Sequence, residues 1–165
     1  MIIEYQRLRA TACPPVRANP SDAGLDLFFN PEPQRTLPLV DPEIDFVEIK
    51  PGQSVLLSTG YKFGIPHGYM LEIKNRSSVA YKRSLTVGAC VVDSGYDGEV
   101  FVNLHNIGTT SQIVRAGDKI AQAVLIPVVH FRAVETSSDN LYSWYPITMS
   151  GRGEGALGST DGGKQ

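Results

Sequence analysis

The sequence predicts an all-β fold, a sandwich or barrel of jelly-roll type. Apolar and polar residues alternate with the period that is typical of strands, and this alternation recurs at short intervals along the 165 residues. Turn signals such as Pro51-Gly52 and Asp97-Gly98 separate the alternating stretches. The chain also contains 16 glycines and 11 prolines, which favour many tight turns over long helices. Many short strands joined by such turns are typical of a jelly roll.

The alternation and the turn signals set the predicted element boundaries. One short helix is predicted at residues 77–83, because serine at the start of this segment can satisfy free backbone amides. The predicted strands cover residues 2–9, 25–29, 46–49, 54–58, 61–65, 69–73, 87–92, 99–105, 112–115 and 120–129.

The length of the chain suits one domain with a hydrophobic core. Residues 1–129 are predicted to form the β-barrel core, and residues 130–165 a C-terminal arm and tail. The tail contains six glycines between residues 151 and 163, a composition typical of flexible segments. Glycine also lets a backbone approach a phosphate closely. The proline-rich residues 30–45 are predicted to form a surface loop.

Composition and charge exclude several classes of protein. The formal net charge is −2, so nothing in the overall balance indicates a nucleic-acid or anionic-membrane partner. No apolar run approaches the ~20 residues needed to span a bilayer. The first residues carry neither a basic nor a sustained apolar region, so no signal peptide is indicated. We therefore expect a cytoplasmic protein whose two cysteines, Cys13 and Cys90, are free thiols.

Two clusters carry groups suited to anions or metals. Asp22 and Asp26 lie on either side of a glycine at the entry to a predicted strand. Arg76-Ser77-Ser78 follows another strand and begins the predicted helix, so its hydroxyls and amides could face an anion. Each cluster alone is also compatible with an ordinary cap or surface ion pair.

Three further stretches combine turns with polar groups. Residues 93–99 form an acidic turn after an apolar run, and residues 117–122 form a turn that leads into a long apolar strand. The glycine-rich tail carries Arg152, Ser159 and Thr160, which are common phosphate-binding residue types. Individually, the two turns could be plain hairpin tips and the tail a frayed terminus.

Taken together and in order, the five stretches resemble the five motifs of the trimeric dUTPase family. The resemblance extends from residue 18 to residue 161, and five motifs in register are far more specific than any one of them. The matching stretches are Asp22-Ala23-Gly24-Leu25-Asp26-Leu27, Arg76-Ser77-Ser78, Val92-Asp93 through Tyr96 to Gly98, Gly117-Asp118-Lys119-Ile120-Ala121-Gln122, and Arg152-Gly153-Glu154-Gly155 with Gly158-Ser159-Thr160.

The resemblance implies a Mg²⁺-dependent homotrimer that hydrolyses dUTP to dUMP and pyrophosphate. This activity would limit uracil incorporation into DNA and supply dUMP for dTMP synthesis. Asp93 would be the general base that activates a water for attack on the α-phosphorus, and would also bind the sugar 3′-hydroxyl. Asp26 would act on the metal through a bound water, because Mg²⁺ keeps much of its hydration.

The resemblance also implies how the substrate is bound. Tyr96 would lie against the deoxyribose and exclude a 2′-hydroxyl, and backbone groups of residues 87–92, including Val87, Cys90 and Val92, would read uracil. The phosphates would be bound by Arg76, Ser77, Ser78 and Gln122, with the tail closing through Arg152, Leu157, Gly158, Ser159 and Thr160.

Four departures from the family pattern stand out, and one of them is Asp161, which replaces a usual glycine in the tail. Cys90 and Gly95 stand where a glycine and an acidic residue are common, and Leu157 stands where an aromatic ring usually stacks on uracil. Leucine would still cover the base with apolar surface. These departures concern recognition of the base more than the phosphate chemistry.

Three alternatives remain open at this point. The first is a related dCTP deaminase, although that family's catalytic glutamate would fall on Asn103 and its second-motif arginine on Tyr81. The second is a dNTP pyrophosphatase of the same fold with relaxed specificity. The third is a non-catalytic, dUTPase-like regulatory trimer, against which the retention of Asp93, Asp26 and Arg76 argues.

Overall fold

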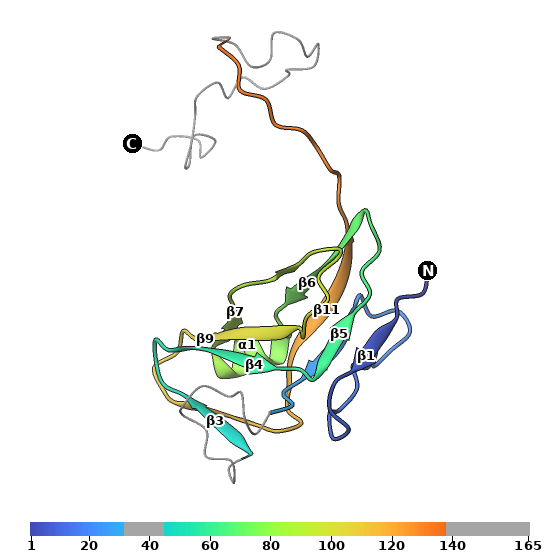
Figure 1. Cartoon of the computed structure of the whole chain (residues 1–165). Helices are drawn as coiled ribbons and strands as arrows, with labels where there is room; N and C mark the ends of the chain where they lie inside the picture. Colours follow the sequence, from blue (N-terminus) through green and yellow to red (C-terminus); the bar gives the residue numbers. More distant parts are fainter. Residues whose placement is uncertain (32–44, 138–165) are drawn as a thin grey trace. The chain divides into compact units, whose positions relative to one another are not determined.

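Antiparallel pairing organises this computed structural model, which describes residues 1–31 and 45–137 (Figure 1). Strand and helix bounds follow the predicted alternation closely. The elements are β1 (Tyr5–Arg7), β2 (Gly24–Phe28), β3 (Phe46–Ile49), β4 (Ser54–Ser58), β5 (Tyr61–Phe63), β6 (Tyr69–Lys74), α1 (Ser77–Arg83), β7 (Leu85–Val87), β8 (Val91–Val92), β9 (Phe101–Asn106), β10 (Gln112–Arg115) and β11 (Lys119–Pro127).

The strands form two larger sheets and two short ribbons. The larger sheets have the strand orders β2-β11-β6-β8 and β4-β9-β7, and the ribbons pair β1 with β5 and β10 with β3. Every named pair is antiparallel. Because neighbours in each sheet are mostly distant in the sequence, long-range pairing brings the predicted motifs together.

One hydrophobic core receives side chains from both larger sheets. Leu27 and Ile73 come from the first sheet, and Leu57, Val102 and Leu104 come from the second. Along β9 the side chains alternate between partly exposed and buried, as expected for a strand with one face on a core. The prediction of an all-β sandwich with one short helix is therefore confirmed.

Helix α1 starts at the predicted residue but is capped differently. Arg76 occupies the N-cap position with extended backbone, and no side chain bonds the first free amides. At the other end Ser84 adopts a left-handed conformation with φ 52°, and its N–H donates to the Ala80 carbonyl. The exposed N-terminal turn places Ser77 and Ser78 at the surface.

Several predicted strands differ from the observed bounds by one or two residues, and two differ more. The strand predicted at residues 2–9 is limited to β1, whose register with β5 covers only Tyr5 to Arg7. The strand predicted at residues 87–92 is interrupted, since Gly88, Ala89 and Cys90 lie between β7 and β8. There the Gly88 N–H still bonds the Asn103 carbonyl in register with β9, but the next amide, that of Ala89, bonds the Asn103 side chain, and the ladder ends.

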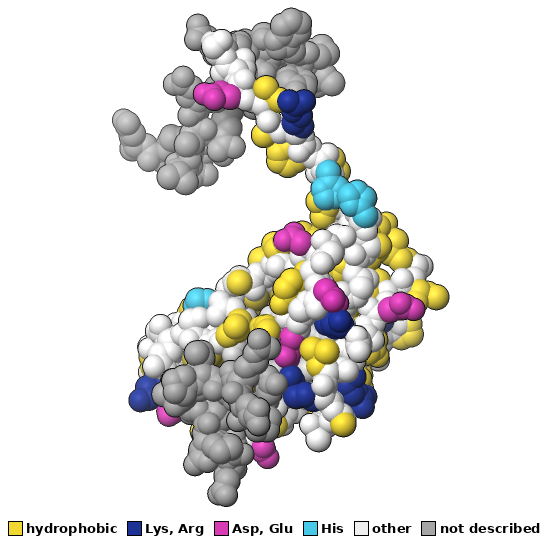
Figure 2. Space-filling view, in the orientation of Figure 1, with side chains coloured by type: hydrophobic (Ala, Val, Ile, Leu, Met, Phe, Trp, Pro, Cys, Tyr) yellow, Lys and Arg dark blue, Asp and Glu magenta, His cyan; other side chains and the backbone are white. Residues whose placement is uncertain are grey.

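The chain divides into two compact units, Met1–His130 and Phe131–Gln165. Most of the predicted loop at residues 30–45 lies outside the described residues. On the described part of the face in Figure 2, acidic and basic side chains are interspersed among hydrophobic ones, in keeping with the small net charge. Within residues 1–31 and 45–137, no helix is both long and apolar enough to cross a membrane.

Candidate active site

The first cluster is built around the carboxylate of Asp26 on β2. Arg76 Nε donates to its Oδ1 at 2.8 Å, and Lys119 Nζ lies 2.8 Å from its Oδ2. Arg76 comes from the N-terminus of α1 and Lys119 from the start of β11, so three separate elements meet here. The Asp26 side chain is only 14% exposed, so both ion pairs are partly shielded from water.

Two opposing effects set the pKa of Asp26. Burial would raise the pKa, because it disfavours the charged carboxylate. Hydrogen bonds and Coulombic attraction from Lys119 and Arg76 outweigh burial, so the pKa is lowered overall. The carboxylate is therefore ionised throughout the neutral range.

Gln122 lies on β11, the strand that pairs with the strand carrying this carboxylate. On β11 it stands opposite Asp26 of β2 and Lys74 of β6. Its Nε2 donates to the Asn75 carbonyl at 2.9 Å, and a side chain at Gly24 would collide with its Oε1. Gly24 of the first motif therefore makes room for Gln122 of the fourth.

The second cluster surrounds a small cavity of about 200 Å³. Cys90 to Asp93 form one wall and Tyr96 another. The turn after β8 is held by Ser94, whose Oγ donates to the Ile65 carbonyl at 3.1 Å, and by Gly95 with φ 88°. At Gly95 a side chain would be strained, so the glycine found in place of an acidic residue fits this turn. The full lining is Ile73, Ala89, Cys90, Val91, Val92, Asp93, Tyr96, Glu99, Val100 and Phe101.

Tyr96 is held in one orientation by its neighbours. Its hydroxyl donates to the Glu99 carbonyl at 2.9 Å, and its ring occupies the space that a side chain at Gly98 would need. The residue is nevertheless 47% exposed, and it lines the small cavity. Gly98 of the third motif is thus required by the position of the tyrosine ring.

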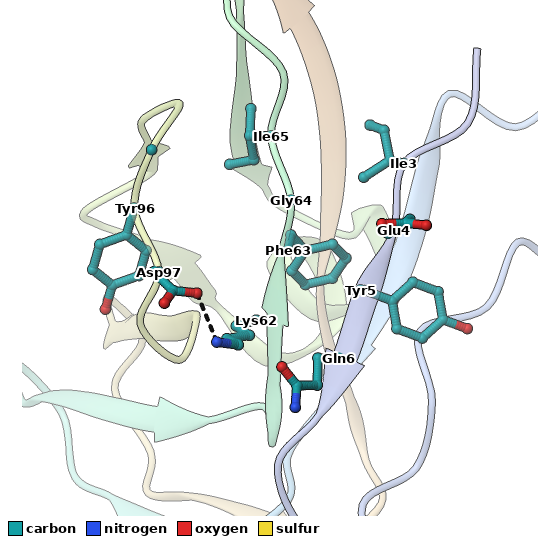
Figure 3. A pocket seen from close by; sticks show the side chains of 11 residues that line it. Ile3, Glu4, Tyr5, Gln6, Lys62, Phe63, Gly64, Ile65, Tyr96 and Asp97 are labelled. Carbon is teal, nitrogen blue, oxygen red and sulfur yellow. Dashed lines mark hydrogen bonds and ion pairs between the residues drawn. The ribbon is translucent and has the colours of Figure 1, made fainter.

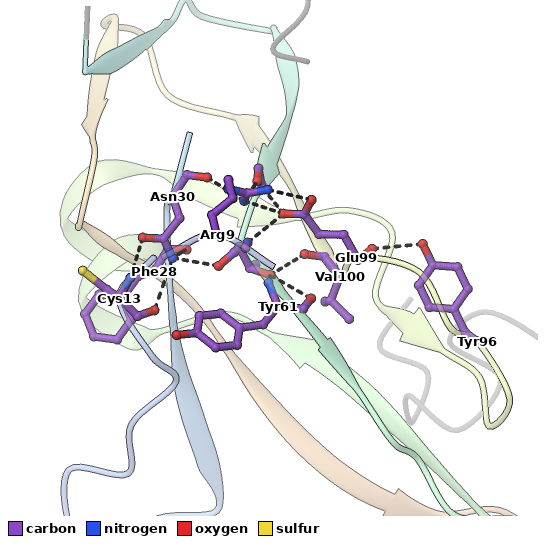
Figure 4. A network of polar contacts seen from close by, with 11 residues as sticks. Arg9, Cys13, Phe28, Asn30, Tyr61, Tyr96, Glu99 and Val100 are labelled. Atoms are coloured by element: carbon purple, nitrogen blue, oxygen red, sulfur yellow. Dashed lines mark hydrogen bonds and ion pairs between the residues drawn. The ribbon is translucent and has the colours of Figure 1, made fainter. Parts of the chain in front are cut away.

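A buried ion pair supports the same turn (Figure 4). Glu99 binds the guanidinium of Arg9 through both carboxylate oxygens, at 2.7 and 3.0 Å. Gly60 N–H and Ser58 Oγ donate to Glu99 Oε1 at 2.7 and 2.5 Å. Burial alone would raise the pKa of Glu99, but the hydrogen bonds from Arg9, Ser58 and Gly60 lower it.

A larger cavity of about 670 Å³ also borders this turn (Figure 3). Side chains of β1 and β5 line it together with Gly95, Tyr96 and Asp97, and Asp97 forms an ion pair with Lys62 at 2.6 Å. Of the predicted site residues it contains only Tyr96. The smaller cavity, which contains Cys90, Val92, Asp93 and Tyr96, is therefore the better candidate for a nucleoside pocket.

The structure brings the predicted residues together in two groups. Asp26, Arg76 and Gln122 belong to the first group, and Asp93 and Tyr96 to the second. In the part of the chain that the structure describes, no hydrogen bond or ion pair directly joins Asp93 to the first group. The predicted tail residues Arg152, Leu157, Gly158, Ser159 and Thr160 lie outside the described residues.

Two residues of the site had no predicted role. Lys119 was part of the fourth motif, but no sequence pattern indicates its ion pair with Asp26, 93 positions earlier. Asn75 precedes the second motif, and its Oδ1 accepts the Val87 N–H at 2.7 Å. Among residues 1–31 and 45–137, no three His, Cys, Asp or Glu side chains gather in a way that could hold a metal by themselves.

Sequence comparison identifies relatives along nearly the whole chain. The dUTPase family model matches residues 44–146. A deoxyuridine 5′-triphosphate nucleotidohydrolase of Gloeobacter violaceus is 34% identical over 160 residues, covering 96% of this chain and 95% of the relative. The enzyme of that name from a Hydrogenobaculum species is 34% identical over 162 residues, covering 97% and 98%.

Solved structures share the fold. A variant of the Staphylococcus bacteriophage 80alpha dUTPase with dUpNHpp matches with a TM-score of 0.75 and 22% identity, covering 96% of this chain and 98% of that one. A variant dUTPase from phage phi11 of S. aureus, described with a structural Mg(II) ion, matches with a TM-score of 0.69 and 21% identity, covering 84% and 99%. These matches confirm the predicted jelly-roll fold. Because the family model spans more than half of the chain and the relatives align along nearly all of it, the chain belongs to the dUTPase family.

Proposed function

We propose that this protein hydrolyses dUTP to dUMP and pyrophosphate. The observation that carries the proposal is the cavity of about 200 Å³ between the Cys90–Asp93 wall and Tyr96. The Asp93 carboxylate, the Tyr96 ring and the backbone of residues 90–92 all line this cavity. Membership of the dUTPase family supports the same reaction.

In this proposal Asp93 is the general base. Its side chain is exposed at the cavity, and none of the residues in 1–31 and 45–137 donates a hydrogen bond to its carboxylate. Both oxygens are therefore available, one for the attacking water and one for the sugar 3′-hydroxyl. Asp93 would orient this water toward the α-phosphorus and take its proton while pyrophosphate leaves.

Tyr96 and the segment after β7 would select the nucleoside. The fixed ring of Tyr96 would lie against the deoxyribose and leave no room for a 2′-hydroxyl. Backbone groups of the stretch that includes Val87, Cys90 and Val92 would pair with uracil O4 and N3–H. Cytosine would leave these groups unpaired, and the thymine methyl group would be excluded by its size.

The Asp26 cluster would bind the triphosphate. Arg76 is held by Asp26, and within residues 1–31 and 45–137 its remaining side-chain N–H groups bind no other residue, so they can face phosphate oxygens; Ser77 and Ser78 are exposed beside it. Gln122 would contribute a further amide donor. We propose that Arg152, Leu157, Gly158, Ser159 and Thr160 then close over the bound substrate from the tail.

The residues fit a magnesium ion that is carried mainly by the substrate. Mg²⁺ bound to a triphosphate keeps several waters and needs only one protein carboxylate nearby. Asp26 is ionised, and each of its oxygens has a lone pair left after its bond to Arg76 or Lys119, so it can accept a hydrogen bond from a metal-bound water. When bound, the ion would neutralise phosphate charge in the transition state.

We further propose that the protein acts as a homotrimer in the cytoplasm, with shared sites. Within the described residues, no hydrogen bond or ion pair joins the Asp26 group to Asp93, and this supports sites assembled from neighbouring chains. Residues 1–129 would form the trimer core, and the arm and tail at 130–165 would reach a neighbouring site. The free thiols Cys13 and Cys90 are compatible with the cytoplasm.

Pyrophosphate release tests the activity. The purified protein is incubated with dUTP, dCTP, dTTP, dATP, dGTP or UTP, with and without Mg²⁺, and the base of each product is identified. We expect dUMP and pyrophosphate from dUTP only in the presence of Mg²⁺. Conversion of dCTP to dUTP would instead establish a deaminase, and equal turnover of all substrates would establish a pyrophosphatase of relaxed specificity.

A further inference from the structure

The segment from Gly88 to Cys90 is the irregular part of the nucleoside pocket. It interrupts the chain between β7 and β8, and Ala89 and Cys90 line the cavity of about 200 Å³. Its far end is fixed because the Ile73 N–H donates to the Cys90 carbonyl at 2.7 Å. Its conformation therefore decides which backbone groups the pocket offers to a base.

Asn103 on β9 holds the middle of this segment. Its carbonyl accepts the Gly88 N–H at 2.9 Å, and its side-chain Oδ1 accepts the Ala89 N–H at 3.3 Å. Within the described part of the chain, the Cys90 N–H has no such acceptor and is left as a donor for a ligand. Two successive amides are thus taken up by one residue, whereas the next amide, that of Cys90, binds no acceptor among the described residues.

The Asn103 side chain is itself fixed from the other side. Its Nδ2 donates to Ser54 Oγ at 2.7 Å and to the Val55 carbonyl at 3.2 Å. Its Oδ1 is therefore the acceptor, and His105 Nε2, 2.8 Å away, donates to it. A side chain at Gly88 would collide with both Asn103 Oδ1 and His105 Nε2, so the segment packs directly on this pair.

We propose that Asn103 is a positioning residue that determines base specificity. It holds Gly88 and Ala89 so that the free groups of the segment match uracil and not cytosine. The inference rests on the proposed function, because it names a residue that sets the selectivity of that same pocket. Among the hydrogen bonds of the described residues, none joins Asn103 to Tyr96, so we expect selection of the sugar to be independent of Asn103.

Three variants of the full-length protein separate this role from a general loss of stability. Asn103→Ala removes the acceptor for Ala89. Asn103→Asp keeps an acceptor in the same place, and Ser54→Ala removes a partner on the opposite side of the amide. For each variant, kcat and KM are measured with dUTP, dCTP and UTP, and dUMP and dCMP affinities are measured by calorimetry.

For Asn103→Ala we expect the KM for dUTP to rise by about three- to tenfold, the effect of one lost hydrogen bond, while kcat stays within about twofold. The preference for dUTP over dCTP should fall, and the preference for dUTP over UTP should not change. Asn103→Asp and Ser54→Ala should keep the base preference of the unmodified protein.

An unchanged preference for dUTP over dCTP in folded Asn103→Ala would overturn the inference. An equal loss in Asn103→Asp would do so too, because the acceptor would then not be the determinant. The calorimetric measurements test the role of Asn103 in base preference separately from the proposed hydrolysis of dUTP. If the unmodified protein binds dUMP over dCMP without hydrolysing dUTP, the proposed function fails, and loss of that preference in Asn103→Ala still supports the role of Asn103.

Discussion

Arg76 and Lys119 bind different oxygens of the same carboxylate, that of Asp26, and both do so at 2.8 Å. The two cations come from α1 and β11, and the carboxylate comes from β2. Together they keep Asp26 ionised and hold it in one orientation. A fixed carboxylate beside an exposed serine pair is suited to orienting the hydrated metal of a bound triphosphate.

The first prediction concerns this carboxylate. Asp26→Asn should raise the Mg²⁺ concentration needed for half-maximal activity by about tenfold or more, as for other residues that orient a metal through its bound waters. The matched control is Asp22→Asn, because Asp22 belongs to the same motif but binds the nearby Asn19 N–H at 2.8 Å. A magnesium titration in which both variants resemble the unmodified protein would remove Asp26 from metal binding.

The second prediction concerns the general base. Asp93→Asn should retain the fold and bind dUMP, but its turnover should fall by about 10² or more. The amide keeps the size of the side chain but cannot take a proton from water. Single-turnover kinetics with dUTP measure this loss directly. Turnover near that of the unmodified protein would exclude Asp93 as the base.

The third prediction concerns selection of the sugar. Because the Tyr96 ring is held by the Glu99 carbonyl and by Gly98, UTP should be a much poorer substrate than dUTP. Tyr96→Ala should narrow this difference by removing the wall. Tyr96→Phe, which keeps the ring, is the control and should preserve most of the discrimination. Equal rates of the unmodified protein on both substrates would refute the steric explanation.

The fourth prediction concerns the buried pair of Arg9 and Glu99. Glu99→Gln should lower the free energy of unfolding by about 3–5 kcal/mol, because it leaves the Arg9 guanidinium largely buried without its counter-charge. The control Asp97→Asn breaks an ion pair with Lys62 whose carboxylate is exposed, and should cost less than about 1 kcal/mol. Urea denaturation at neutral pH compares the two.

The same pair predicts a dependence of stability on pH. The folded-state pKa of Glu99 is below its usual value of 4.5, so its stabilisation is fully present above that value and is lost as the pH falls toward the folded-state pKa. Melting temperatures of the unmodified protein should therefore fall below pH 4.5, and those of Glu99→Gln should fall less steeply. Parallel acid profiles for the two proteins would contradict this contribution of Glu99.

Local patterns were sufficient to predict most of the fold. Alternation and turn residues predicted β3, β4, β10 and α1 with the bounds that the structure has. They failed for the stretch from Gly88 to Cys90, because its apolar residues look like a strand while its amides bind Asn103 on a distant strand. Alternation reports on burial and carries no information about which strand is the neighbour.

The site could be predicted as motifs but not as contacts. The family resemblance pointed to Asp26, Arg76 and Asp93, yet the partners that fix them depend on pairings between residues far apart in the chain. Lys119, Asn75 and Asn103 had no assigned role for this reason. Glu99 is the first residue of the apolar strand predicted at residues 99–105. A carboxylate in that position is the one sequence signal that could have indicated an internal ion pair.

The fifth prediction concerns sites shared between chains. Asp93→Asn chains are mixed equally with chains truncated after Ser150, and the subunits are scrambled by unfolding and refolding. If base and tail come from different chains, about a quarter of the sites receive both intact parts by random assembly. If they come from the same chain, no site recovers. Activity that stays at the level of the separate variants, in trimers shown to be mixed, would contradict shared sites.

The most direct test of the account is to follow the oxygen of the attacking water. Hydrolysis of dUTP is carried out in ¹⁸O-labelled water with Mg²⁺, and the products are analysed by mass spectrometry. Attack on the α-phosphorus, directed by Asp93, predicts one labelled oxygen in dUMP and none in pyrophosphate. Label in pyrophosphate, or formation of dUDP and phosphate, would contradict the proposed reaction.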